Sequence, residues 1–177
     1  VKAQANTPQS KPKTKLDLKT LPSFTRVLLL EQSAETSANV SVGDLNGDGY
    51  PDLVLAKGRH WPLIDRVLLN DGRGRFPVAH NLGDVADRSY SVTLADIDRD
   101  GDLDVVVGND APDPKRVYAN DGKANFRLIS TFGRPEWPTR NASVADVNRD
   151  GLPDIIVANR SDDGKGPNYI CFNKGKG

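Results

Sequence analysis

An acidic pattern of nine residues recurs three times in this chain and constrains its fold more than any other feature. The copies run from Asp44 to Asp52, from Asp96 to Asp104 and from Asp146 to Asp154. Each copy has Asp or Asn at positions 1, 3 and 5, Gly at position 6 and Asp at position 9. Alternate side chains place their oxygens inside a tight loop, and the Gly allows a turn that presents the carbonyl of position 7. About five oxygen ligands of this kind, with water, suit Ca²⁺.

The pattern starts like an EF-hand loop but does not continue as one. An EF-hand needs a bidentate Glu at position 12, where this chain has Leu55, Val107 and Val157. The β-branched apolar runs that follow each copy predict strands rather than helices. A single copy could be an Asp- and Gly-rich turn without metal. Three copies in one register favour calcium-binding hairpins within sheets.

Two further landmarks keep step with the acidic pattern. The first Asp recurs after 52 and then 50 residues, and Phe24, Phe76 and Phe126 each lie 20 residues before it. Turns of the Asn-Asp-Gly type start at Asn70 and Asn120, with Asn-Lys-Gly at Asn173. Such turns mark hairpins. All-strand repeats of about 40–50 residues predict the blades of a β-propeller.

We therefore predict an all-β fold of three four-stranded antiparallel repeats, a partial propeller or a ring closed by oligomerisation. The blades are expected at residues 24–75, 76–125 and 126–177, after a flexible Lys- and Pro-rich tether at residues 1–22. The second strand of each unit is apolar at consecutive positions, as in Val105-Val106-Val107. Such a strand buries both of its faces, which blades stacked face to face achieve and a sandwich does not.

These three copies resemble FG-GAP/VCBS-type repeats, as in the integrin α-subunit β-propeller and many secreted bacterial proteins. The resemblance covers residues 24–177 and implies one Ca²⁺ between the first and second strands of each blade, three ions in all. Position 7 would contribute its carbonyl. The ligands implied are Asp44, Asn46, Asp48, Tyr50, Asp52, Asp96, Asp98, Asp100, Asp102, Asp104, Asp146, Asn148, Asp150, Leu152 and Asp154.

The number of blades departs from that family, whose propellers typically have about seven. The third unit is expected to lack its outer strand, and Phe24–Leu30 is predicted to be an outer-type strand without a blade before it. Two explanations remain open. The chain is a piece of a longer propeller, which we prefer, or copies of it associate to close a ring.

Composition excludes several classes of function. The 177 residues carry no formal net charge, so no broad basic surface is expected for nucleic acid. No apolar run approaches the ~18 residues of a membrane span. No Gly-rich phosphate loop and no Ser/His/Asp arrangement is present, and the paired carboxylates are assigned to metal. Calcium sites of this type belong outside the cell, so we expect a secreted or cell-surface protein.

Any ligand is expected on the face opposite the acidic loops, where the connecting segments vary between units. These segments are residues 57–65, 108–115, 158–168, 31–39, 80–90 and 131–141. The candidate ligand-binding residues are Trp61, Trp137, His60 and Arg140. Either Trp could instead fill the gap between blades, and either His could simply lie on a loop or strand end.

Two functions remain for this chain, besides a third possibility that it is a spacer without a ligand. The first is a non-enzymatic calcium-binding module of an extracellular protein that binds a protein or carbohydrate partner in adhesion, with Ca²⁺ in a structural role. The alternative is the propeller domain of a secreted carbohydrate-active enzyme, of the lyase or dehydratase type. The alternative requires Tyr, His, Arg or Lys to converge on one face, and Tyr90, Arg88, Arg134 and Arg140 are available.

Overall fold

The structure is a computed structural model that describes residues 22–32, 35–161 and 166–175. The chain divides into two units, with the boundary between Gln32 and Ser33. All of the strands belong to the second unit. The predicted tether lies outside the described residues, apart from Pro22.

The predicted strand at Phe24–Leu30 is wrong. Residues 22–31 have no regular secondary structure, and the side chains of Phe24, Val27 and Leu29 are exposed. An apolar, β-branched run favours extended backbone, but it becomes a strand only when its backbone pairs with a neighbour. The composition of this segment therefore did not suffice to predict its structure.

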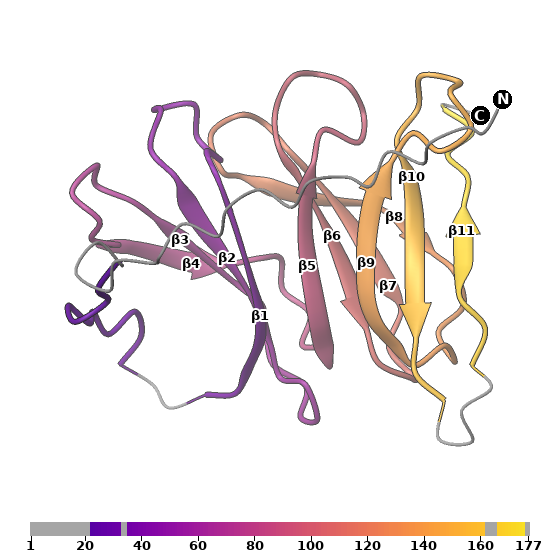
Figure 1. The fold of residues 1–177 in the computed structure, drawn as a ribbon, viewed down its shortest axis with the longest axis horizontal. Coiled ribbons are helices and arrows are strands. Elements are labelled where there is room, and N and C mark those ends of the chain that lie inside the picture. The colour runs from indigo at the N-terminus through magenta and orange to yellow at the C-terminus, as the bar shows by residue number, and fades with distance from the viewer. Residues whose placement is uncertain (1–21, 33–34, 162–165, 176–177) are drawn as a thin grey trace, which may run out of the picture. The chain divides into compact units, whose positions relative to one another are not determined.

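The second unit contains three antiparallel sheets, seen side by side in Figure 1. Their orders are β1-β2-β3-β4, β5-β6-β7-β8 and β11-β10-β9. The strands are β1 (Ser37–Gly43), β2 (Asp52–Lys57), β3 (Arg66–Leu69), β4 (Val78–Asn81), β5 (Ser89–Ala95), β6 (Asp104–Asn109), β7 (Lys115–Asn120), β8 (Phe126–Phe132), β9 (Thr139–Ala145), β10 (Asp154–Asn159) and β11 (Tyr169–Cys171).

This architecture confirms the predicted all-β, blade-like repeats. Two sheets have four strands, and in the described residues the third has three, because only β11 follows β10. The first strands of the three blades begin at Ser37, Ser89 and Thr139, well before the acidic loop that each one enters. These early residues are polar, and they become important for the loops at that end of the sheets.

The sheets pack face to face, as the consecutive apolar residues predicted. On β6, Val105 and Val107 pack with Val54 and Leu82 of the first sheet. Val106 points the other way and packs with the third sheet. All six residues of β6 are buried, because the second sheet has a neighbour on both faces. The core of this unit therefore consists of two layers between three blades.

Hydroxyl groups join the first strands of neighbouring blades. Ser41 on β1 donates to the carbonyl of Val92 on β5 at 2.7 Å, and Thr93 on β5 donates to the carbonyl of Ala142 on β9 at 2.6 Å. Ser41 and Thr93 occupy the same repeat position. The repeated Ser/Thr is therefore explained by the spacing between blades.

Candidate functional site

The acidic loops connect the first and second strands of each blade, as predicted. We call them loop 1 (Asp44–Asp52), loop 2 (Asp96–Asp104) and loop 3 (Asp146–Asp154). The Asp at position 1 folds each loop around its own carboxylate. Asp96 accepts hydrogen bonds from the backbone N–H groups of Asp100 and Gly101 at 3.0 and 3.1 Å. Asp44 and Asp146 make the corresponding bonds in the other two loops.

The side chains at positions 3 and 5 point toward each other in loops 1 and 3. The amide Nδ2 of Asn46 donates to Asp48 at 3.0 Å, and that of Asn148 donates to Asp150 at 2.8 Å. The other carboxylate oxygen of Asp48 accepts the N–H of position 7, Tyr50. In loops 1 and 3 these contacts hold the side chains at positions 3 and 5 against each other.

The Asp at position 9 ties each loop to the Asn-type turn that follows the third strand. Asp52, Asp104 and Asp154 are fully buried. In loop 2, one oxygen of Asp104 accepts the N–H of Ile97 at 2.8 Å, and the other accepts the N–H of Asn120 at 2.9 Å. Loops 1 and 3 repeat both bonds. The acidic loops and the Asn-type turns therefore lie on one face of the unit, which we call the acidic face.

Loop 2 gathers its carboxylates most closely. One oxygen from each of Asp96, Asp98 and Asp104 lies within 4.8 Å of the others. Burial raises the pKa of Asp104, and the negative charge of Asp98 adds to this effect. A set made only of carboxylate and carbonyl oxygens suits a hard cation such as Ca²⁺. The residues present thus fit the ion that the sequence predicted.

The fourth position of the loops has a requirement that the sequence did not reveal. Its backbone is left-handed in all three loops, with φ of 74° at Gly47, 66° at Arg99 and 62° at Arg149. Non-glycine residues adopt this region at a cost of about 1 kcal/mol or more. The invariant Gly at position 6 adopts it as well, as expected for a sharp turn.

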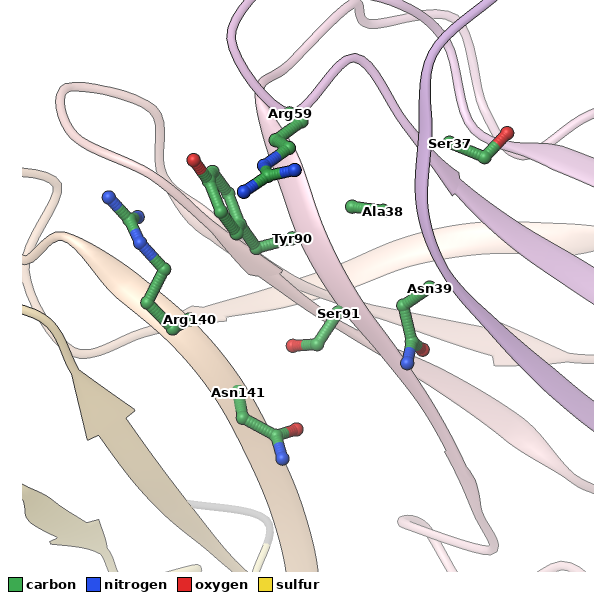
Figure 2. Close-up of a pocket in the computed structure, with 8 residues that line it drawn as sticks. All are labelled: Ser37, Ala38, Asn39, Arg59, Tyr90, Ser91, Arg140 and Asn141. Atoms are coloured by element: carbon green, nitrogen blue, oxygen red, sulfur yellow. The ribbon is translucent and has the colours of Figure 1, made fainter.

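A pocket lies at the opposite ends of the first strands, on the face formed by the β2–β3, β4–β5, β6–β7 and β8–β9 connections. We call this the loop face. The cavity is about 350 Å³, within the range of small-ligand sites. Figure 2 shows its lining, which comes from all three blades. The residues are Ser37, Ala38, Asn39, Arg59, Tyr90, Ser91, Arg140 and Asn141.

Tyr90 stands at the centre of the charged groups in this pocket. In Figure 2 its ring lies between the guanidinium groups of Arg59 and Arg140. Their Cζ atoms are 5.7 and 3.9 Å from the ring centroid, within the range of cation–π contacts. The Tyr90 hydroxyl lies 3.3 Å from His60 Nδ1, and Arg140 pairs with Asp110 at 2.7 Å. These contacts bring together Tyr, His and Arg side chains, three of the residue types that the enzyme alternative requires on one face.

The four predicted ligand-binding residues fall into two groups. His60 and Arg140 both contact Tyr90. Trp61 is 69% exposed and does not line the pocket. Trp137 stacks on Tyr169 with parallel rings 4.1 Å apart and packs against the core between the second and third blades. Tyr90 was available only to the enzyme alternative in the sequence, and Arg59 was not singled out as a candidate there. Tyr90 and Arg140 occupy the same repeat position, which is the signal that could have suggested their proximity.

The fold and the loops define a class of protein, a β-propeller-type repeat module with acidic hairpin loops. Comparison with protein families agrees with this class, since the FG-GAP-like repeat profile matches residues 44–107 and 100–157. The chain belongs to the FG-GAP-like repeat family. Such repeats are typical of extracellular proteins. A comparison with curated proteins found no match. In the described ranges, no helix has the length and apolar character needed to cross a membrane.

Proposed function

We propose that this chain is an extracellular module in which Ca²⁺ stabilises three propeller blades and the loop face binds a protein or carbohydrate partner. The observation that carries the metal assignment is the gathering of Asp96, Asp98 and Asp104 oxygens within 4.8 Å. The same hydrogen-bond pattern in the other loops supports one ion in each. Position 1, 3, 5 and 9 side chains and the carbonyls of Tyr50, Asp102 and Leu152 would hold the ions.

The ions would act on stability rather than on chemistry. A bound cation offsets the repulsion among carboxylates that each loop brings together. At ~1 mM Ca²⁺ and a Kd of ~0.1 mM, one site stabilises the folded state by about 1.4 kcal/mol. Three such sites contribute about 4 kcal/mol, a substantial part of the stability of a typical domain.

Chelation tests this role directly. Removing Ca²⁺ with EDTA is expected to lower the melting temperature by about 10 °C, and added Ca²⁺ should restore it. Isothermal titration should give three ions per chain. Mg²⁺ at the same concentration serves as the control, because it prefers a smaller octahedral site. A melting curve that EDTA leaves unchanged would falsify the structural role of calcium.

Single loops can be tested with an isosteric substitution. Asp96→Asn keeps an oxygen at position 1 but removes its charge, so it should reduce the titrated stoichiometry from three ions to two. The matched control is Asp84→Asn, an exposed carboxylate in the β4–β5 connection of the loop face. It should leave both stoichiometry and melting unchanged. Equal effects of the two substitutions would show that general charge, not the loop, governs calcium binding.

A second candidate function is favoured by one observation, the cluster of Tyr90, His60, Arg59 and Arg140. The Tyr90 hydroxyl and His60 lie in contact beside two guanidinium groups, and such groups can serve as acid and base next to a neutralised carboxylate. The chain would then be the propeller of a secreted polysaccharide lyase. Incubation with polygalacturonate and measurement of unsaturated product by ultraviolet absorbance test this. Turnover that Tyr90→Phe abolishes would favour the enzyme.

A further inference from the structure

The loop-face pocket is built from one stretch of the repeat, used three times. Its lining includes residues at matching positions of β1, β5 and β9, where each first strand begins. One position stays small and polar in all three blades, as Asn39, Ser91 and Asn141. The position before it varies and is Ala38, Tyr90 and Arg140. The position that is small and polar in every blade therefore gives the pocket a common lining, and the position before it gives each blade a different side chain.

Arg59 differs from the salt-bridged cations of the loop face. Across the described residues, the salt bridges found on this face do not include Arg59, whose contact is with the Tyr90 ring. The paired groups are Lys57 with Glu35, Arg88 with Asp113, Arg116 with Asp87, Arg134 with Glu136 and Arg140 with Asp110. The pocket thus contains two guanidinium groups, and none of its lining residues is a carboxylate.

The backbone holds Arg59 in place beside the pocket. Its own φ is 43°, and the preceding Gly58 has φ of 94°. A Cβ at Gly58 would lie 2.2 Å from the carbonyl oxygen of Trp61, so only Gly fits there. Leu63 and Asp87 exchange backbone hydrogen bonds of 3.1 Å, which fix this connection to the start of β5. A strained and well-anchored turn therefore carries Arg59 beside Tyr90.

We propose that this pocket binds the carboxylate of a hexuronate residue in an acidic polysaccharide. The proposal rests on the proposed function and names the ligand class of its loop face. Arg59, which has no salt bridge among the described residues, would bind the carboxylate. Arg140 lies on the other side of the Tyr90 ring, paired with Asp110, and would donate to a ring hydroxyl of the sugar. Tyr90 spaces the two guanidinium groups. Asn39, Ser91 and Asn141 offer amide and hydroxyl groups to the ring hydroxyls of a sugar.

An acidic peptide is the other source of a carboxylate, and the lining favours it less. Peptide-binding sites anchor apolar or aromatic side chains in apolar pockets. In this pocket the aliphatic lining residue is Ala38, and guanidinium groups cover the Tyr90 ring. The pocket therefore offers little apolar surface to the side chain of a peptide. A cavity lined by polar groups suits a ligand that carries hydroxyls around its whole ring.

The ligand itself gives the first test. Titration calorimetry at constant free Ca²⁺ compares tri-galacturonate with its methyl ester, in which methyl groups cap the carboxylates and remove their charge. The acid should bind, with an affinity that falls as salt rises, and the ester should bind at least about tenfold more weakly. A short peptide containing Asp serves as the competing ligand and should bind more weakly than the acid. Equal binding of acid and ester, or tighter binding of the peptide, overturns the proposal.

Variants of the protein give the second test. Arg59→Gln should weaken tri-galacturonate binding about tenfold while melting stays normal, because Arg59 is exposed. The matched control is Arg127→Gln, an exposed arginine on the outer strand β8, which should bind as the wild type does. Arg140→Gln should also weaken binding. If loss of its Asp110 pair unfolds that variant, Arg59→Gln and the ester comparison still decide the outcome.

The outcome separates this inference from the proposed function. Stabilisation by Ca²⁺ without binding of the acid retains the calcium module and rejects the hexuronate site. Binding of the acid without any effect of EDTA on melting retains the site and rejects the structural calcium. Wild-type affinity in Arg59→Gln also rejects the site.

Discussion

Lys115 is a buried cation that holds the connection leading to Arg140. Its side chain has no exposed surface. The ammonium donates to the backbone carbonyls of Asp113 at 3.2 Å, Pro135 at 3.0 Å and Trp137 at 2.6 Å. The last two belong to the β8–β9 connection, just before Arg140 on β9. We predict that replacing this lysine loosens both the joint between blades and the loop-face pocket.

Lys115→Met removes the charge while keeping most of the side-chain volume. The Trp137 carbonyl still accepts the N–H of Thr139 at 2.9 Å. The Asp113 and Pro135 carbonyls lose their contact with Lys115, and a carbonyl left without a partner costs about 1–3 kcal/mol when it is buried. Because Pro135 is exposed, the main loss is at the Asp113 carbonyl, and we expect a total of about 1–3 kcal/mol, which lowers the melting temperature by about 3–9 °C for a unit of this size.

Thermal and urea unfolding at neutral pH in the presence of Ca²⁺ measure this effect. The matched control is Lys123→Met, an exposed lysine in the turn that follows the same strand. It should change stability by less than about 0.5 kcal/mol. If both variants melt at the same temperature, the three carbonyl bonds of Lys115 do not hold the loop, and this reasoning is refuted.

The pH dependence of stability gives an independent readout of the same lysine. Burial lowers the pKa of Lys115 from 10.5 to about 8. Between these values the unfolded chain binds more protons than the folded one, so this group makes the folded state more stable as pH rises from about 8 to 10.5. The stability difference between the wild type and Lys115→Met should therefore change over that window and level off outside it.

Three further predictions concern stability and assembly. Burial raises the pKa of Asp65 to about 7, so the folded state binds the extra proton and loses stability as pH rises from about 4 to 7. The loss of stability over this pH range is at most about 4 kcal/mol, and the Asp65→Asn variant should not show it. Urea unfolding at a series of pH values measures the difference. Trp137→Ala should lower the free energy of unfolding by about 2 kcal/mol or more, because the stacking of Trp137 on Tyr169 is lost. Trp61→Ala should change the free energy of unfolding by less than about 0.5 kcal/mol. The exposed apolar side chains of β1 and β11 predict self-association in light scattering, which Val42→Lys on β1 should weaken; a monomer at every concentration contradicts this.

The repeat made the fold and the acidic loops predictable. A side chain at position 1 bonds to backbone four and five residues on, so each loop folds largely with its own atoms. The apolar run after each loop was predictable as well, because its consecutive apolar residues require a neighbouring sheet on both faces. Periodicity and local hydrogen bonding depend on the spacing of residues along the chain, which can be read directly from the sequence.

Other local details were not predictable in this way. The left-handed backbone at Arg99 and Arg149 has no signal in the residue type, because arginine rarely adopts it. The segment at Phe24–Leu30 has the composition of a strand but is not one. In both cases the conformation depends on the hydrogen bonds that the surrounding structure offers, and composition alone does not record them.

The sequence by itself thus determined that the chain forms all-β blades and where each acidic loop lies. Only the tertiary structure decided which residues of different blades meet. Tyr90 and Arg140 come together because β5 and β9 pack side by side, and the bridge between Gly58 and Ser89 brings Arg59 beside Tyr90. The tertiary structure also distinguished the two tryptophans, since Trp137 stacks on Tyr169 and Trp61 is exposed. Contacts within a loop depend on residue spacing, whereas contacts between blades depend on how whole sheets stack, and the packing of their buried faces fixes that stacking.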